Sequence, residues 1–261
     1  MTDTTLSSTR PPMSLIMGSL FRADFTVLLR NGRTMILNIA VPILILIVTD
    51  LHPNQKAPAN GFGSVNFDVG LALTYGLMAS SLIGYSITVA RDRDAGVFQR
   101  LRVTPAPTWA IMTSRLLVQL VLDLIMTIIV VTVGVIMHHI DYSIGDLLLI
   151  GCVALLGGVT FLAIGQAIVG LVRSASVVNA IGRVLYALLL LIGLLGSSGL
   201  LGTTVQVIAE WSPVGALITL FDGVVTLNSW GGLETAALCA CVGYVLVGTF
   251  IGIRWFRWES R

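Results

Sequence analysis

Long apolar runs recur along the chain, and charged residues are concentrated in the short stretches between them. A helix that crosses a bilayer needs about 20 mainly apolar residues. Six runs meet or approach that length, at residues 34–49, 67–90, 116–137, 147–172, 184–201 and 235–253. The first is the shortest and contains Pro42, which we expect to kink the helix. The pattern predicts an all-α polytopic membrane protein with six transmembrane helices.

Two further stretches are too apolar to be plain loops. Residues 13–33 place apolar side chains on one helical arc and arginines on the other, with Asp24 as the one charge on the apolar side. We expect an amphipathic interfacial helix there; the alternative is an extension of the first span. Residues 202–234 predict an outer re-entrant hairpin of two short helices that meet at Ser212 and Pro213; the alternative is a simple extracellular loop.

The composition excludes several classes of protein. Hydrophobic residues make up 56% of the 261-residue chain and charged residues 11%, whereas an ordinary soluble domain has about 25% charged residues. This balance excludes a soluble enzyme, a disordered chain and a nucleic-acid-binding domain, so we expect no nucleic acid partner. Lys56 is the single lysine, so the chain lacks a phosphate-binding loop that ends in Gly-Lys-Ser/Thr.

The arginines indicate how the helices are oriented. Cytoplasmic loops of membrane proteins are enriched in arginine and lysine. When both termini are placed in the cytoplasm, all 14 arginines lie on the inner side and only Lys56 lies outside. We therefore expect a multi-pass protein of the plasma (inner) membrane. Its segments would be a disordered N-terminus (1–12), the interfacial helix (13–33), the transmembrane domain (34–254) and a cytoplasmic tail (255–261), with no cleavable signal peptide.

The inner loop at residues 91–109 has the features of a docking site for another protein. Four arginines and two aspartates fall within twelve residues, and Val97, Phe98 and Leu101 follow at helical spacing. Buried apolar anchors would supply affinity to a partner, while charges would set the register. Thr104-Pro105 should end the helix. The alternative is a solvated loop that is positive only because it faces the cytoplasm.

These residues resemble the inner loop of ABC-2 type transporter permeases, and in particular of daunorubicin-resistance-type drug exporters. The shared pattern is an acidic and basic run, a glycine, Arg-Leu-x-x-Thr-Pro and a tryptophan before the next span; here it consists of Arg91, Asp92, Arg93, Asp94, Gly96, Arg100, Leu101, Thr104, Pro105 and Trp109. The six spans, the amphipathic helix and the outer hairpin agree with the same family. Many members begin the loop with glutamate, so Asp92 and Asp94 depart from the pattern.

The resemblance implies a function and a set of partners. The chain would be a permease without an ATPase site, and two copies of a separate ABC ATPase would bind ATP and Mg. A second permease copy, or a related permease, would complete the complex. The inner loop, with Phe98, would be the coupling element. The exported substrate would be an amphipathic drug-like or lipid-like molecule, with efflux and antibiotic resistance as the outcome.

Polar residues inside the spans are candidates for a functional role, because an ionisable group in hydrocarbon is costly. Arg115, Gln119 and Asp123 follow one helical stripe. They could line a path or lock helices together; alternatively, Asp123 is an interfacial residue paired with Arg115. Asn38 and Gln166 could contact substrate or form hydrogen bonds between helices.

Two other functions remain open from the residues alone. An ion-coupled secondary transporter would normally have more buried carboxylates than Asp123, and a membrane assembly protein would need no transport path. The three cysteines and three histidines show no metal-ligand spacing, so we expect no metal site.

Overall fold

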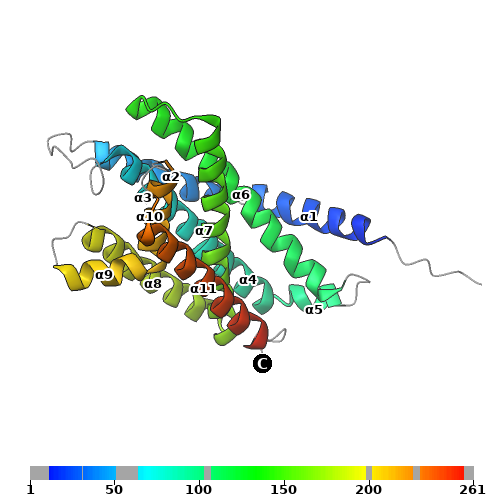
Figure 1. Cartoon of the computed structure of the whole chain (residues 1–261). Coiled ribbons are helices and arrows are strands. Elements are labelled where there is room, and N and C mark those ends of the chain that lie inside the picture. Colours follow the sequence, from blue (N-terminus) through cyan, green and yellow to red (C-terminus); the bar gives the residue numbers. More distant parts are fainter. Residues whose placement is uncertain are drawn as a thin grey trace, which may run out of the picture.

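The computed structural model describes residues 12–30, 32–50, 64–102, 107–197, 202–225 and 230–255. For a few positions inside these ranges, Asn38 among them, only the backbone is described. The described part of the chain is helical and contains no strand (Figure 1). Its helices are α1 (Met13–Arg30), α2 (Gly32–Asp50), α3 (Val65–Leu77), the π-helical η1 (Met78–Gly84), α4 (Tyr85–Asp94), α5 (Val97–Arg102), α6 (Thr108–His138), α7 (Ile144–Leu171), α8 (Ala175–Ser197), α9 (Thr203–Trp211), α10 (Pro213–Val225) and α11 (Gly232–Trp255).

The helices confirm an all-α polytopic membrane protein. Within the described residues, five helices are long and apolar enough to cross a bilayer, and the α3–η1–α4 segment forms one of them, at Val65–Asp94. The remaining expected span, 34–49, lies in α2, whose apolar part Ile39–Thr49 is shorter. The 19 residues of α2 extend about 28 Å, close to the hydrocarbon thickness of about 30 Å. Pro42 lies inside α2 and is buried.

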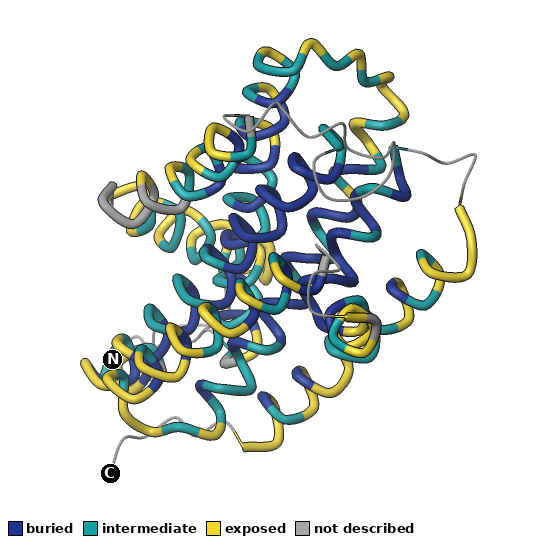
Figure 2. The backbone as a smooth tube through the Cα atoms, turned by 90° about the vertical axis from the view of Figure 1, so that its left-hand side faces the viewer, coloured by how far each residue is buried: buried dark blue, intermediate teal, exposed yellow. Residues whose placement is uncertain are grey.

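The α3–η1–α4 helix forms the centre of the bundle. In its most apolar 18-residue stretch, 83% is buried. The helices α2, α6, α7, α8 and α10 all pack around it. Leu71, Leu73 and Leu77 are at most 1% exposed, and residues 67–78 form an unbroken buried stretch. Figure 2 shows the buried residues gathered at the centre of the bundle. Because this helix touches so many others, its polar side chains are the ones best placed to link the bundle together.

The outer hairpin has the predicted two-helix form, so the alternative of a simple loop is wrong. α9 and α10 are bent by 80° relative to each other, and the break falls at Ser212. α10 is buried along most of its length, whereas α9 is largely exposed. Gly215 permits the sharp bend, since a Cβ there would lie 1.9 Å from the Ala209 carbonyl oxygen.

The N-terminal amphipathic segment forms α1, which ends at Arg30 and packs against α6. Ile16, Leu20 and Phe21 lie on its half-buried face, and Arg22 and Arg30 on its exposed face. The predicted helix is therefore confirmed over 13–30. Its position at the membrane interface stays a prediction.

Candidate functional site

The predicted coupling loop forms a helical corner, which we call the α4–α5 corner (residues 91–102). α4 ends at Asp94, a turn follows at Ala95 and Gly96, and α5 begins at Val97. Gly96 has φ +69°, a left-handed conformation that glycine adopts without steric cost. The single glycine of the motif is thus the residue that allows α5 to turn away from α4.

Arg93 fastens this corner to the end of α7. Its guanidinium donates hydrogen bonds of 2.7–2.8 Å to the carbonyl oxygens of Val169, Val172 and Arg173. The last carbonyls of a helix have no partner within the helix, and a cation there also interacts favourably with the helix dipole. Arg93 is 3% exposed, so the expectation that it forms part of a docking surface is wrong. Its role is to hold α4 against α7.

Asp94 connects the corner to the next helix in the same way. Its Oδ2 accepts a hydrogen bond of 3.0 Å from the backbone N–H of Ala175, the first residue of α8. A carboxylate at a helix N-terminus satisfies an unpaired N–H group and interacts favourably with the dipole. Arg93 and Asp94 together join α4 to both sides of the 172–174 connection.

Arg115 of α6 joins four helices at the same end of the bundle. Its Nη1 lies 2.5 Å from Oδ2 of Asp92 on α4, and its guanidinium lies 4.8 Å from the Phe98 ring centroid on α5. Its Nε lies 3.9 Å from Oδ1 of Asp24 on α1. Ser114 donates to the other oxygen of Asp24 at 2.7 Å. Asp24, the charge on the apolar side of α1, is thus the residue that attaches α1 to α6.

Burial raises the pKa of Asp24, and the hydrogen bond from Ser114 and the charge of Arg115 oppose that shift. Both partners stabilise the carboxylate form of Asp24. A movement of α6 relative to α1 would therefore change the contacts of the Asp24 carboxyl group.

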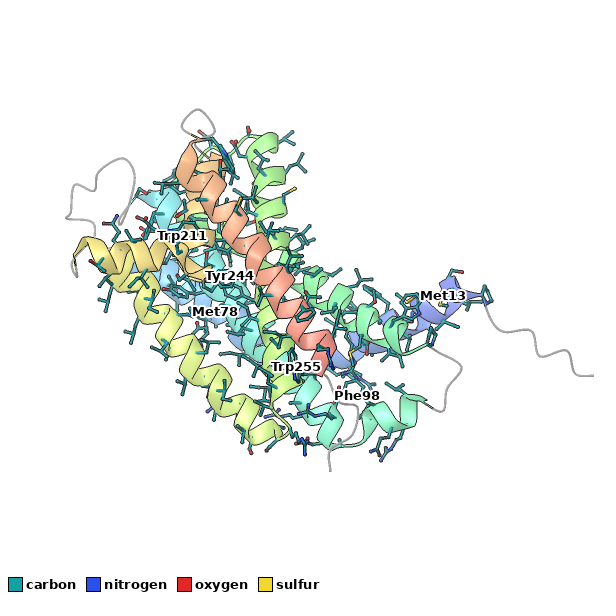
Figure 3. All side chains as sticks on the ribbon, turned by 60° about the horizontal axis from the view of Figure 1, so that its bottom comes forward. Met13, Met78, Phe98, Trp211, Tyr244 and Trp255 are labelled. Atoms are coloured by element: carbon teal, nitrogen blue, oxygen red, sulfur yellow. The ribbon has the colours of Figure 1, made fainter. Side chains whose placement is uncertain are left out.

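Phe98 is an internal anchor and not an exposed one. It is fully buried, with Tyr85, Val89, Leu162 and Val169 in the same apolar cluster. Figure 3 shows Phe98 on the side of α5 that faces the bundle. Leu101 is half-buried against the same cluster. The expectation that Phe98 reaches into a partner is therefore wrong, because its ring is already covered by this chain and by Arg115.

Apart from Ala95, the exposed side chains that the structure describes in the corner are polar. Arg91, Asp94, Gln99 and Arg100 face outward. Thr104 and Pro105 lie outside the described residues, so the predicted end of the helix stays a prediction. A partner would meet a polar, mainly cationic surface fixed from behind by Arg93, Phe98 and Arg115.

A second polar group lies deep between η1 and α6, and we call it the polar cluster (Ser80, Ser81, Gln119 and Asp123). Asp123 has no exposed surface. Ser81 donates to its Oδ2, and the Gln119 amide donates to its Oδ1 at 3.3 Å and to the Ser80 hydroxyl at 2.6 Å. The alternative in which Asp123 pairs with Arg115 is wrong, because Arg115 pairs with Asp92. Asp123 forms the inter-helix lock.

Two backbone features make room for this cluster. The η1 segment is π-helical, and it directs the consecutive serines 80 and 81 toward α6. π-helical turns often occur at functional sites. On α7, Gly158 lies so close that a Cβ would be 2.8 Å from Asp123 Oδ2. Sequence reasoning missed both serines, and their adjacency inside an apolar span was the available signal.

The other two intramembrane candidates differ in outcome. Gln166 on α7 accepts a hydrogen bond of 2.9 Å from the Tyr85 hydroxyl on α4. It therefore links two helices, which was one of its two predicted roles, the other being substrate contact. The side chain of Asn38 lies outside the described residues, and its role stays a prediction.

The chain is similar in sequence to one known family and to a transport permease. A sequence model of the family described as ABC-2 type transporter matches residues 17–225. The chain is also 25% identical over 171 residues to YvfS of Bacillus subtilis (strain 168), a protein named as a candidate transport permease; the match covers 66% of this chain and 69% of YvfS. The family match at residues 17–225 includes most of α1, the α4–α5 corner, the polar cluster and the outer hairpin.

Proposed function

The chain belongs to the ABC-2 type transporter family, and from this premise we propose that it is the permease subunit of an ATP-driven exporter. It is a multi-pass membrane protein and a transporter permease subunit, and the family implies association with an ABC ATPase subunit. In our proposal that separate subunit binds ATP and Mg and hydrolyses the ATP. Two copies of it would act on a pair of permeases.

The α4–α5 corner carries this proposal. Its exposed face, with Arg91, Gln99 and Arg100, is available to a cytoplasmic partner. Behind that face, Arg93 and Asp94 bond to the ends of α7 and α8. Arg115 extends the contact to α1 and α6. A displacement of α5 would therefore be transmitted to several helices at once. Coupling of transport to an ATP-driven change in the partner requires such transmission.

The second permease copy is supported by α8. Val177, Ile181, Val184, Leu188, Leu191 and Leu195 form one exposed apolar stripe with alternating spacings of four and three residues. That spacing is the seam of a two-helix coiled coil. We propose that α8 packs against the α8 of a second copy.

The substrate we propose is an amphipathic drug-like or lipid-like molecule moved out of the cytoplasm or the inner leaflet, with efflux of antibiotics as one outcome. The basis is the family resemblance and the apolar character of the spans. The chain would lie in the plasma (inner) membrane, with both termini in the cytoplasm. The ion-coupled alternative is less well supported, because Asp123 is engaged with neutral partners from η1 and α6.

Co-purification tests the coupling proposal. The tagged chain is extracted from its own membrane, and an ABC ATPase is identified by mass spectrometry and by ATP hydrolysis. Arg91→Glu combined with Arg100→Glu should reduce recovery of the ATPase at least about tenfold, since like charges facing each other across an interface cost several kcal/mol. Arg22→Glu is the matched control, because Arg22 is exposed on α1. Full ATPase recovery by the double variant would contradict docking at this corner.

A further inference from the structure

A cavity separate from the α4–α5 corner and the polar cluster lies between α4, α6, α7 and α11. Its volume is about 520 Å³, within the range of about 300–1,000 Å³ that small-molecule sites occupy. It is located where α6 begins and α11 ends, since Trp109 and Ile253 both line it. By the arginine distribution, this is the cytoplasmic half of the bundle.

The packing of α11 explains why the cavity forms. α11 packs tightly on α7, because a Cβ at Gly248 would lie 2.7 Å from the Ala163 backbone and one at Gly252 would lie 2.6 Å from Gln166 Cγ. Small residues allow such close helix approach. α6 also packs on α7 but not closely on α11. The space between α6 and α11 is therefore closed at its base by α7 and α4.

The lining combines an apolar body with a few polar side chains; Thr113 and Thr249 line it, and its main polar point is the Tyr85–Gln166 pair. Leu116, Leu120, Val159 and Leu162 supply apolar walls. At the polar point, Gln166 Oε1 accepts from the Tyr85 hydroxyl at 2.9 Å. The hydrogen bond from Tyr85 uses the Gln166 oxygen, so the amide nitrogen is the group of this side chain that can donate into the cavity. An amide N–H donor in an apolar cavity needs an acceptor to offset its desolvation.

The residues around the mouth are exposed and are of types that suit the membrane interface. Trp109 is 56% exposed and Ile253 is 77% exposed. Tryptophan is enriched at the level of the lipid headgroups. The next residue, Arg254, is also exposed and would favour an anionic headgroup at this end of the bundle. The mouth is therefore at the depth where phospholipid acyl chains begin.

We propose that this cavity binds one acyl chain of an anionic phospholipid from the adjoining leaflet. The chain lies along the walls formed by α6 and α7, and the Gln166 amide donates to the ester carbonyl at its head. The bound lipid fills the space between α6 and α11 and contacts α4 through Tyr85. The site does not depend on the proposed export function, since no ATPase and no exported substrate is needed to fill it.

Photo-crosslinking tests the proposal with the purified full chain in vesicles of phosphatidylethanolamine and phosphatidylglycerol, without ATP or an ATPase. The probe is phosphatidylglycerol with a diazirine in one acyl chain. Adducts should concentrate on residues 112–120, 159–166 and 249–253. At a fixed amount of probe, a larger proportion of unlabelled phosphatidylglycerol in the vesicles should displace the probe. An adduct pattern spread evenly over the exposed faces of all helices, or no displacement, would overturn the site.

Two variants and one control make the test specific. Thr113→Phe fills the cavity from α6 and should lower adduct formation at least about tenfold, while Thr132→Phe places the same ring on an exposed position of α6 and should leave it unchanged. Gln166→Leu should lower it about three- to tenfold, the value of one hydrogen bond. Thermal unfolding verifies that each variant is folded. If Thr113→Phe does not fold, undiminished labelling of Gln166→Leu would by itself overturn the proposal.

Discussion

Individual side chains in this protein have roles that depend on what covers them. Phe98 and Arg100 are two residues apart in the same short helix, yet Phe98 is fully buried and Arg100 is exposed. Asp92 pairs with Arg115, whereas Asp123, about two turns farther along α6, accepts hydrogen bonds from Ser81 and Gln119. The docking anchor and the alternative ion pair fail for the same reason: in each case a partner within the chain already contacts the side chain.

We predict that Phe98→Ala destabilises the permease itself. Removal of a buried phenylalanine ring costs about 3–5 kcal/mol, and Arg115 would lose its cation–π contact. Thermal unfolding of the purified chain, without any ATPase, should show a lower Tm. Leu101→Ala is the control and should have a smaller effect, since Leu101 is half-buried. An unchanged Tm together with lost ATPase binding would show instead that Phe98 is a docking anchor.

We predict that Asp123→Leu loosens the contact between η1 and α6. Ser80, Ser81 and Gln119 would lose a shared network, and buried donors without an acceptor cost about 1–3 kcal/mol. Asp123→Asn should be milder, because an amide oxygen still accepts one hydrogen bond. Tm and transport are the measurements.

The control for Asp123 is Asp141→Ala, since Asp141 is exposed in a loop. Asp146 is unsuitable despite its position at a helix end, because it forms a capping box with Ser143 at the start of α7. Equal, negligible effects of Asp123→Leu and Asp141→Ala would contradict a structural lock.

At the scale of elements, helices are joined mainly at their ends on one side of the bundle and by small residues along their lengths. The α4–α5 corner illustrates the first device, with Arg93 and Asp94 bonded to the ends of α7 and α8. The approach of α11 to α7 at Gly248 illustrates the second. The bonds between helix ends fix the direction of α5. The close approach of α11 to α7 leaves the cavity beside α6.

We predict that Gly96→Ala impairs coupling more than it impairs folding. The left-handed backbone at Gly96 would cost an alanine about 1–2 kcal/mol, and the strain would be relieved most easily by a turn of α5 away from its present direction. ATP hydrolysis stimulated by the permease should fall, while insertion and yield are retained. Gly18→Ala is the control, since nothing lies within 4 Å of a Cβ there. Normal coupling in Gly96→Ala would show that the direction of α5 is unimportant.

At the scale of the whole molecule, the two ends of the bundle differ in chemistry. The end formed by the α4–α5 corner, the 172–174 connection and the end of α11 carries arginines, whereas the outer hairpin α9–α10 lies toward the opposite end (Figure 1). Connections between successive spanning helices alternate between the two ends of the bundle, and an even number of spans would place both termini at the same end.

We predict that both termini and the α4–α5 corner face the cytoplasm. In a variant without its native cysteines, Gln99→Cys should resist a membrane-impermeant thiol reagent in intact cells and react once the membrane is opened. Ser64→Cys, at the start of α3, should react in intact cells. Labelling of Gln99→Cys from outside would reverse the topology.

The sequence by itself determined the membrane class, the approximate positions of the long helices, the break at Ser212 and the family. These depend on the length and hydropathy of each segment and on the positions of its glycines and prolines. Each segment must fit the bilayer by these local properties, whichever helices it packs against. Only the tertiary structure decided that Arg93 is internal, that Phe98 is covered, that Ser80 and Ser81 reach Asp123 and that a cavity lies beside α11. Each of these depends on which helices touch and at what rotation, and a helical pattern that is apolar on nearly all sides does not specify its neighbours.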